Sequence, residues 1–176
     1  MGYFEQFILI GIKRLFLTDT TFKILNKTGV VFMNNQDTIK LLKECDAGTK
    51  MAVSSIDEVL ESVCDVKLKE LLQESKSHHE KLENDICGML EKHNAGEKEP
   101  GMIAKGMSWM KTNMKMTMDN SDATVADLIT DGCNMGIKTL NRYKNQYKAA
   151  DEAAMGVCDK LISIEEKLGK ELRQYL

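Results

Sequence analysis

The chain has 176 residues, of which 43% are hydrophobic and 29% are charged, a composition typical of one globular domain. A single proline and an aromatic content of 6% argue against β-sandwiches, barrels and collagen-like chains and favour an all-helical fold. The formal net charge of -3 gives no general attraction to nucleic acid or to anionic lipid, so the sequence predicts neither partner.

The N-terminal part differs in composition from the rest of the chain. All five phenylalanines precede Met33, and residues 1–32 contain four basic and two acidic side chains. We therefore expect residues 1–32 to be a translated leader outside the native protein, and residues 33–176 to form the domain. The alternative is a real amphipathic helix, with one apolar face formed by Phe4, Ile8, Ile12 and Leu15.

Two long helices are predicted next, each with apolar residues three and four positions apart. The first covers residues 35–63, and its apolar positions are Leu42, Cys45, Thr49, Ala52, Ile56, Val59 and Val63. Asp65 can cap the second helix, which ends at residues 94–96. Its corresponding positions are Leu68, Leu72, Ser75, His79, Leu82, Ile86, Met89 and His93. The short corner between the two helices makes them antiparallel neighbours.

A shorter helix, two more long ones and a crossover complete the prediction. The short helix follows residues 96–101 and has Ile103, Met107, Met110 and Met114 on one face. The third long helix begins within residues 119–122, and its pattern runs through Ala126, Ile129, Cys133, Gly136, Leu140, Tyr143 and Tyr147. The last begins near Asp151 and continues through Cys158, Leu161, either Ile164 or Glu165, Leu168 and Leu172.

The two hairpins are separated by a long connection of roughly 27 residues, which suits a crossover along the bundle. That connectivity is ferritin-like: an all-α four-helix bundle with a helical crossover between its second and third helices. A plain up-and-down bundle of five helices is the alternative.

Three segments resemble a bacterial family of small ferritin-like four-helix proteins of unassigned function. They are residues 41–48 (LLKECDAG), 102–110 (MIAKGMSWM) and 140–143 (LNRY), and the resemblance covers roughly residues 35–176. It implies a ferritin-like fold in a bacterial protein. Di-iron members of the wider class use a Glu on each of two helices and Glu-x-x-His on each of the other two.

Most of that ligand pattern is missing. His79 has Lys76 three residues before it, the family's third-helix glutamate falls on Gly136, and Glu165 begins Glu-x-x-Leu. On the first helix Asp46 is expected at the edge of the inward face, and Glu44 is expected to point further away. The remaining candidates, Asp46, His79 and Glu165, could hold one divalent ion. Each could equally be structural: His79 a hydrogen-bonded core residue, and the two carboxylates solvated or paired with lysine.

Two other patterns invite a functional interpretation. Six methionines lie within residues 102–118, where packing of the connector is favoured over copper binding. Trp109 is expected to anchor this connector. Gly132 and Gly136 would let a neighbouring helix approach closely, within the bundle or in a homo-oligomer.

The cysteine pattern indicates the compartment. The spacing of the five cysteines offers neither a disulfide framework nor a zinc ribbon and fits reduced thiols in the cytoplasm. The longest apolar run, residues 7–12, is shorter than the roughly 20 residues that span a bilayer.

The leading hypothesis is a non-catalytic, cytoplasmic ferritin-like bundle that acts without a cofactor as a binding or assembly module. Its partner would be an unidentified protein or a second copy of the chain. The alternative is a protein that binds iron or manganese through Asp46, His79 and Glu165. A third hypothesis, supported only by the cysteines, is a regulator that responds to thiol oxidation.

Overall fold

The computed structural model describes residues 35–96 and 121–176, and this part of the chain is all-helical. The helices are α2 (Asn35–Leu60), α3 (Val66–Lys92), α5 (Asp122–Gln146) and α6 (Glu152–Leu172), followed by the 3-10 turn η1 (Arg173–Tyr175). The predicted all-α class and the four long helices are confirmed. No described helix is long and apolar enough to cross a membrane.

Other expectations concern residues outside the described ranges. They include the leader at residues 1–32, the connector helix with its methionines, and the anchoring role of Trp109. The chain divides into two units, residues 1–33 and 34–176, and every described residue belongs to the second.

Side-chain caps fix where three of the helices begin. Asp65 accepts a hydrogen bond from the Leu68 amide at 2.9 Å, and Asp151 accepts one from the Ala154 amide at 2.8 Å. Ser121 caps α5 in the same way. Each cap satisfies one of the amides that a helix N-terminus leaves without a partner.

Two helix ends follow local backbone geometry. Asn94 adopts a positive φ of 51° just beyond α3, a conformation that commonly terminates helices. Helix α2 ends at Leu60, three residues before the predicted end, because the Ser62 amide folds back onto the Val59 carbonyl at 2.9 Å. Val63 nevertheless stays buried.

The predicted periodicity identifies most of the core. Helix α3 buries Leu68, Leu72, Ser75, His79, Leu82, Ile86 and Leu90. The last of these replaces the predicted Met89, which is only partly buried. On α6 the buried residue is Glu165, whereas Ile164 packs at the edge of the core. Of the two alternatives at this point of the pattern, Glu165 is therefore the inward one.

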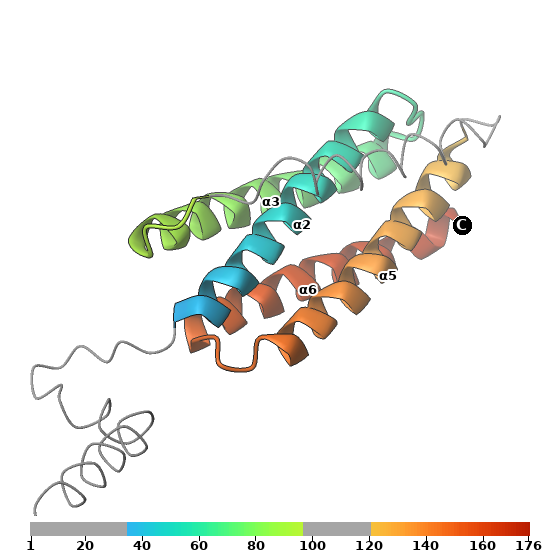
Figure 1. Ribbon diagram of the computed structural model, residues 1–176. Helices are drawn as coiled ribbons and strands as arrows, with labels where there is room; N and C mark the ends of the chain where they lie inside the picture. The colour runs from blue at the N-terminus through green and yellow to red at the C-terminus, as the bar shows by residue number, and fades with distance from the viewer. Residues whose placement is uncertain (1–34, 97–120) are drawn as a thin grey trace, which may run out of the picture. The chain divides into compact units, whose positions relative to one another are not determined.

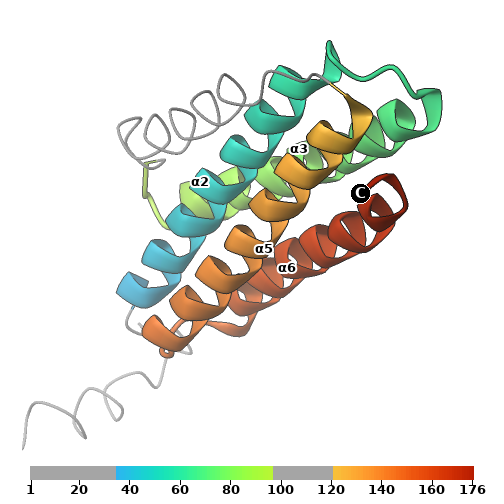
Figure 2. The same ribbon diagram turned by 90° about the vertical axis from the view of Figure 1, so that its right-hand side faces the viewer.

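Hydrogen bonds at both ends of the bundle define how the helices run. At one end, the carboxylate of Asp122 accepts from the amides of Cys64 and Asp65 at 2.8 and 2.9 Å. At the other end, the Asp151 amide donates to the Thr38 hydroxyl at 2.9 Å. Helices α3 and α5 consequently start at the same end and run parallel, whereas each consecutive pair, α2–α3 and α5–α6, is antiparallel (Figures 1 and 2).

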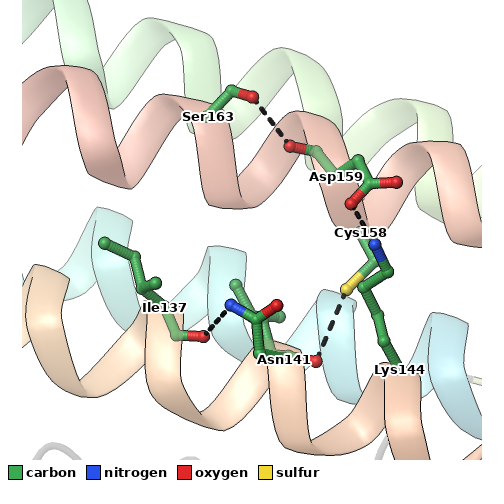
Figure 3. Close-up of polar contacts among 7 residues, drawn as sticks. Ile137, Asn141, Lys144, Cys158, Asp159 and Ser163 are labelled. Atoms are coloured by element: carbon green, nitrogen blue, oxygen red, sulfur yellow. Dashed lines mark hydrogen bonds and ion pairs between the residues drawn. The ribbon is translucent and has the colours of Figure 1, made fainter.

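Helices α2 and α6 also pack against each other, and the buried hydrophobic residues form two clusters, each of which contains residues of both hairpins. Polar contacts join α5 to α6 along one edge (Figure 3). Lys144 forms an ion pair with Asp159, and the Cys158 thiol donates to the Leu140 carbonyl at 3.9 Å.

Candidate functional site

His79 and Glu165 form a buried polar pair in the centre of the bundle. The exposed fraction is 0% for His79 and 8% for Glu165. The His79 Nδ1 atom lies 2.8 Å from the Ser75 carbonyl oxygen one turn earlier, so Nδ1–H donates to that carbonyl. The Nε2 atom lies 3.2 Å from Oε1 of Glu165. The pair therefore connects α3 to α6, and both imidazole nitrogens have partners.

The surroundings of His79 favour its protonated form. Burial acts to lower the pKa of His79, but the hydrogen bond and negative charge of Glu165, together with the Ser75 carbonyl, outweigh it. The pKa is therefore raised above its ordinary value of 6.5. When Nε2 carries a proton, it donates to the Glu165 carboxylate and gives a charge-assisted hydrogen bond.

Asp46, the third predicted ligand, is fully buried but has other partners. Its two carboxylate oxygens lie 3.0 and 3.1 Å from Nζ of Lys50, one turn further along α2. The Cys87 thiol of α3 also approaches Oδ1, at 3.9 Å. From the sequence, pairing with lysine was the structural alternative to a role as a metal ligand, and Asp46 has such a pairing.

The register of α2 against α3 explains why Asp46 does not join the pair. Asp46 lies opposite Cys87, and Asp57 lies opposite Lys76. These two contacts define one antiparallel register, which places Asp46 at the level of Cys87. His79 is two turns away along α3, a separation of roughly 12 Å at the usual rise per residue.

These residues do not match the ligand set of a di-iron site, which needs six protein ligands. Of the three sequence candidates only His79 and Glu165 come together. Within residues 35–96 and 121–176 there is no group of three or more His, Cys, Asp and Glu side chains that could hold a metal ion.

Gly136 supports the position of Glu165. A Cβ atom at Gly136 would lie 3.6 Å from both Cδ and Oε1 of Glu165, so the carboxyl group rests on the bare backbone of α5. A long acidic side chain at Gly136 would compete with Glu165 for this space.

A cavity of about 250 Å³ lies between α2 and α5, and the His79–Glu165 pair forms part of its wall. The cavity exists because both helices have small residues there: Ala47, Gly48 and Ala52 on α2, and Gly132 and Gly136 on α5. Apart from its chain neighbours and the backbone of its own helix, no described atom would lie within 4 Å of a Cβ at Gly132. Within the described bundle, Gly132 therefore borders open space instead of a close helix contact, whereas Gly136 lets the Glu165 side chain of α6 approach the backbone of α5 closely.

The remaining walls are mostly apolar, with the hydroxyl side chains of Ser55 and Thr139 among them. Met51, Leu140, Leu161 and other apolar side chains surround the space. Met135, which is 44% exposed, marks where the lining reaches the protein surface. Glu44 and Tyr143 also line the cavity.

Burial and the nearby Glu44 raise the pKa of Tyr143, so its phenol stays neutral near neutral pH. Glu44 was expected to point further from the core than Asp46, and it is only partly buried whereas Asp46 is fully buried. It lies on the same face of α2 as Ala47 and Gly48. In the sequence, the spacing of small residues on the two helices was the available signal for this cavity.

Cys133 contributes a buried thiol to the cavity wall, and burial and Glu165 raise the pKa of this thiol.

The described chain is thus a bundle of long helices with a ligand-sized cavity and a buried imidazole–carboxylate pair in its wall. Comparison with family models, with curated proteins and with solved structures gave no match.

Proposed function

We propose that the chain is a non-catalytic binding module with a ferritin-like fold, and that its ligand occupies the cavity between α2 and α5. The observation that carries this proposal is the cavity itself. Its volume of about 250 Å³ exceeds the roughly 150 Å³ of an engineered apolar cavity that binds benzene. Apolar walls with a few convergent polar groups are typical of small-molecule sites.

The parallel direction of α3 and α5 supports the ferritin-like part of the proposal. The end of α3 and the start of α5 lie at opposite ends of the bundle, as a crossover connection requires. An up-and-down bundle of the four described helices alone would make α3 and α5 antiparallel, whereas the alternative up-and-down bundle of five helices makes them parallel, as a crossover does.

The geometry of the buried pair supports binding rather than catalysis. Both nitrogens of His79 already have partners within the protein, and a general base needs a nitrogen within reach of its substrate. All five cysteines are free thiols, in keeping with the cytoplasmic location that we propose with this function.

Cavity-filling variants test the proposal. In protein with isotope-labelled methionine methyl groups, titration with toluene should give saturable shifts at Met51 and Met135, which line the cavity. Gly132→Leu should fill the space and abolish these shifts. Gly88→Leu is the matched control, because Gly88 also lies within a helix with open space around it but outside the cavity.

The absence of saturable shifts in the wild type, or equal shifts in the Gly132→Leu variant, would overturn the proposal. Near-stoichiometric iron or manganese in protein purified from metal-replete cells would instead support the alternative metal-binding function. The melting temperatures of Gly132→Leu and of the control Gly88→Leu should also be compared. A similar value shows that Gly132→Leu is folded, so that a loss of shifts reports a filled cavity.

A further inference from the structure

The charged side chains that line the cavity indicate which ligand charge it favours. The titratable side chains that line it are Glu44, His79, Cys133, Tyr143 and Glu165. The described lining includes two carboxylates but neither lysine nor arginine. With Cys133 and Tyr143 neutral, even a protonated His79 leaves the lining with a net negative charge. An anionic ligand would therefore be repelled, and a cationic one attracted.

Glu165 can accept further hydrogen bonds. An ionised carboxylate has about four lone-pair positions, and among residues 35–96 and 121–176 the strong donor that contacts Glu165 is His79, at Oε1. Its other polar neighbour is the thiol of Cys133, and a thiol is a weak donor. A ligand in the cavity that donates a hydrogen bond to Glu165 would thus satisfy a further lone pair of a carboxylate that is almost fully buried.

The size and walls of the cavity limit the rest of the ligand. A volume of about 250 Å³ lies between that of a benzene-sized cavity and those of drug-sized pockets. Met51, Leu140 and Leu161 offer apolar contacts along its length. A compact hydrocarbon body, such as one ring with a short arm, would fit this space.

We propose that the cavity binds a small protonated organic amine, with its ammonium group at Glu165 and its apolar body between α2 and α5. This inference rests on the proposed binding function and specifies its ligand class. An ammonium group adds the attraction of opposite charges to its hydrogen bond with a carboxylate, which a neutral hydroxyl group does not. The ammonium takes the place of the proton on His79 Nε2, which passes to solvent: neutral His79 keeps its Nδ1–H on the Ser75 carbonyl and offers Nε2 as an acceptor beside Oε1 of Glu165. The buried carboxylate then remains paired with one positive charge.

Three probes of nearly equal size test the charge preference on the full chain: benzylamine, benzyl alcohol and benzoate. Benzylamine should bind at least tenfold more tightly than benzyl alcohol, and benzoate should bind more weakly than both. Isothermal titration at constant pH and low salt measures all three. Equal affinity for benzylamine and benzyl alcohol, or tighter binding of benzoate, would overturn the amine assignment.

The Glu165→Gln variant tests the position of the ammonium group. In this variant the preference for benzylamine over benzyl alcohol should fall at least tenfold. Glu166→Gln is the matched control, since the neighbouring Glu166 is exposed and lies outside the cavity lining. An unchanged preference in Glu165→Gln would contradict the proposal. If this variant does not fold, the probe comparison on the wild type still decides.

The two proposals fail in different ways. If toluene and benzyl alcohol bind in the cavity but benzylamine has no advantage, the binding function stands and the amine assignment falls. If no probe binds, and toluene also gives no saturable shift at the labelled methionine methyl groups, both the binding function and the amine assignment are wrong.

Discussion

The backbone amide of Asp65 donates a hydrogen bond of 2.9 Å to the carboxylate of Asp122. The neighbouring Cys64 amide bonds to the other oxygen of the same carboxylate at 2.8 Å. A single side chain at the start of α5 therefore holds the turn between α2 and α3. This contact fixes one hairpin against the other at one end of the bundle.

Replacing Asp122 by alanine should destabilise the protein. The variant loses two hydrogen bonds to a charged acceptor and a favourable negative charge at the start of a helix. We expect the free energy of unfolding to fall by about 1–2 kcal/mol, as measured by urea denaturation. Asp127→Ala is the control, because Asp127 is exposed on the same helix. Equal effects of the two substitutions would show that the turn is not held by Asp122.

The His79–Glu165 pair should show strong coupling in a double-mutant cycle. His79→Leu leaves the Glu165 carboxylate almost fully buried without its imidazole, which should cost about 3 kcal/mol. Replacing both residues by leucine removes the stranded charge, and such replacements are often neutral or stabilising. The double variant should therefore be more stable than the His79→Leu variant. Simple addition of the two single losses would contradict a direct interaction.

The same pair should make stability depend on pH. The pKa of His79 is raised in the folded protein, because Glu165 and the Ser75 carbonyl outweigh the effect of burial. The stabilisation by protonated His79 is therefore fully present below the unfolded pKa of about 6.5. It is lost as the pH rises through the higher folded pKa.

Urea denaturation at several pH values above about 6 measures this loss. The free energy of unfolding of the wild type, measured relative to that of the His79→Leu/Glu165→Leu variant, should fall as pH rises. His78→Gln, at the exposed neighbouring histidine, should keep the wild-type profile. A constant difference across the range would refute the raised pKa.

The thiols should react in an order set by their exposure. Cys64 is exposed, whereas Cys45 and Cys133 are buried. Hydrogen bonding to Cys158 and burial raise the pKa of Cys45, which suppresses its reactive thiolate. A short pulse of iodoacetamide on the native protein should modify Cys64 and spare Cys45 and Cys133, as read by mass spectrometry. Modification of Cys45 as fast as Cys64 without denaturant would contradict the packing of α2 on α6.

The sequence predicts the features that depend on neighbouring residues. Asp65 and Asp151 were expected at helix starts, and both cap helices, because capping needs only the residue and the next turn. The apolar rhythm likewise identified the inward face of each helix. At the one ambiguous place, Glu165 was inward although Ile164 is more hydrophobic, since Gly136 and His79 make room and a partner for its carboxylate.

The axial offset between helices could not be predicted in this way. An apolar pattern states which face of a helix is buried, but it does not say which turn of one helix meets which turn of the next. Asp46 and His79 therefore both lie inside the bundle yet two turns apart. The cavity was missed for a related reason: it depends on small residues of α2 and α5 meeting at one level.

The hydrogen bonds at the two ends of the bundle indicate the order in which its parts fold. Asp122 bonds to residues 57 and 58 positions away, and the Thr38–Asp151 bond spans 113 positions. Such contacts form only after a long loop has closed, whereas each helical hairpin gains its contacts locally. The hairpins should thus form early and dock late, so that Asp122→Ala accelerates unfolding while leaving the rate of folding nearly unchanged.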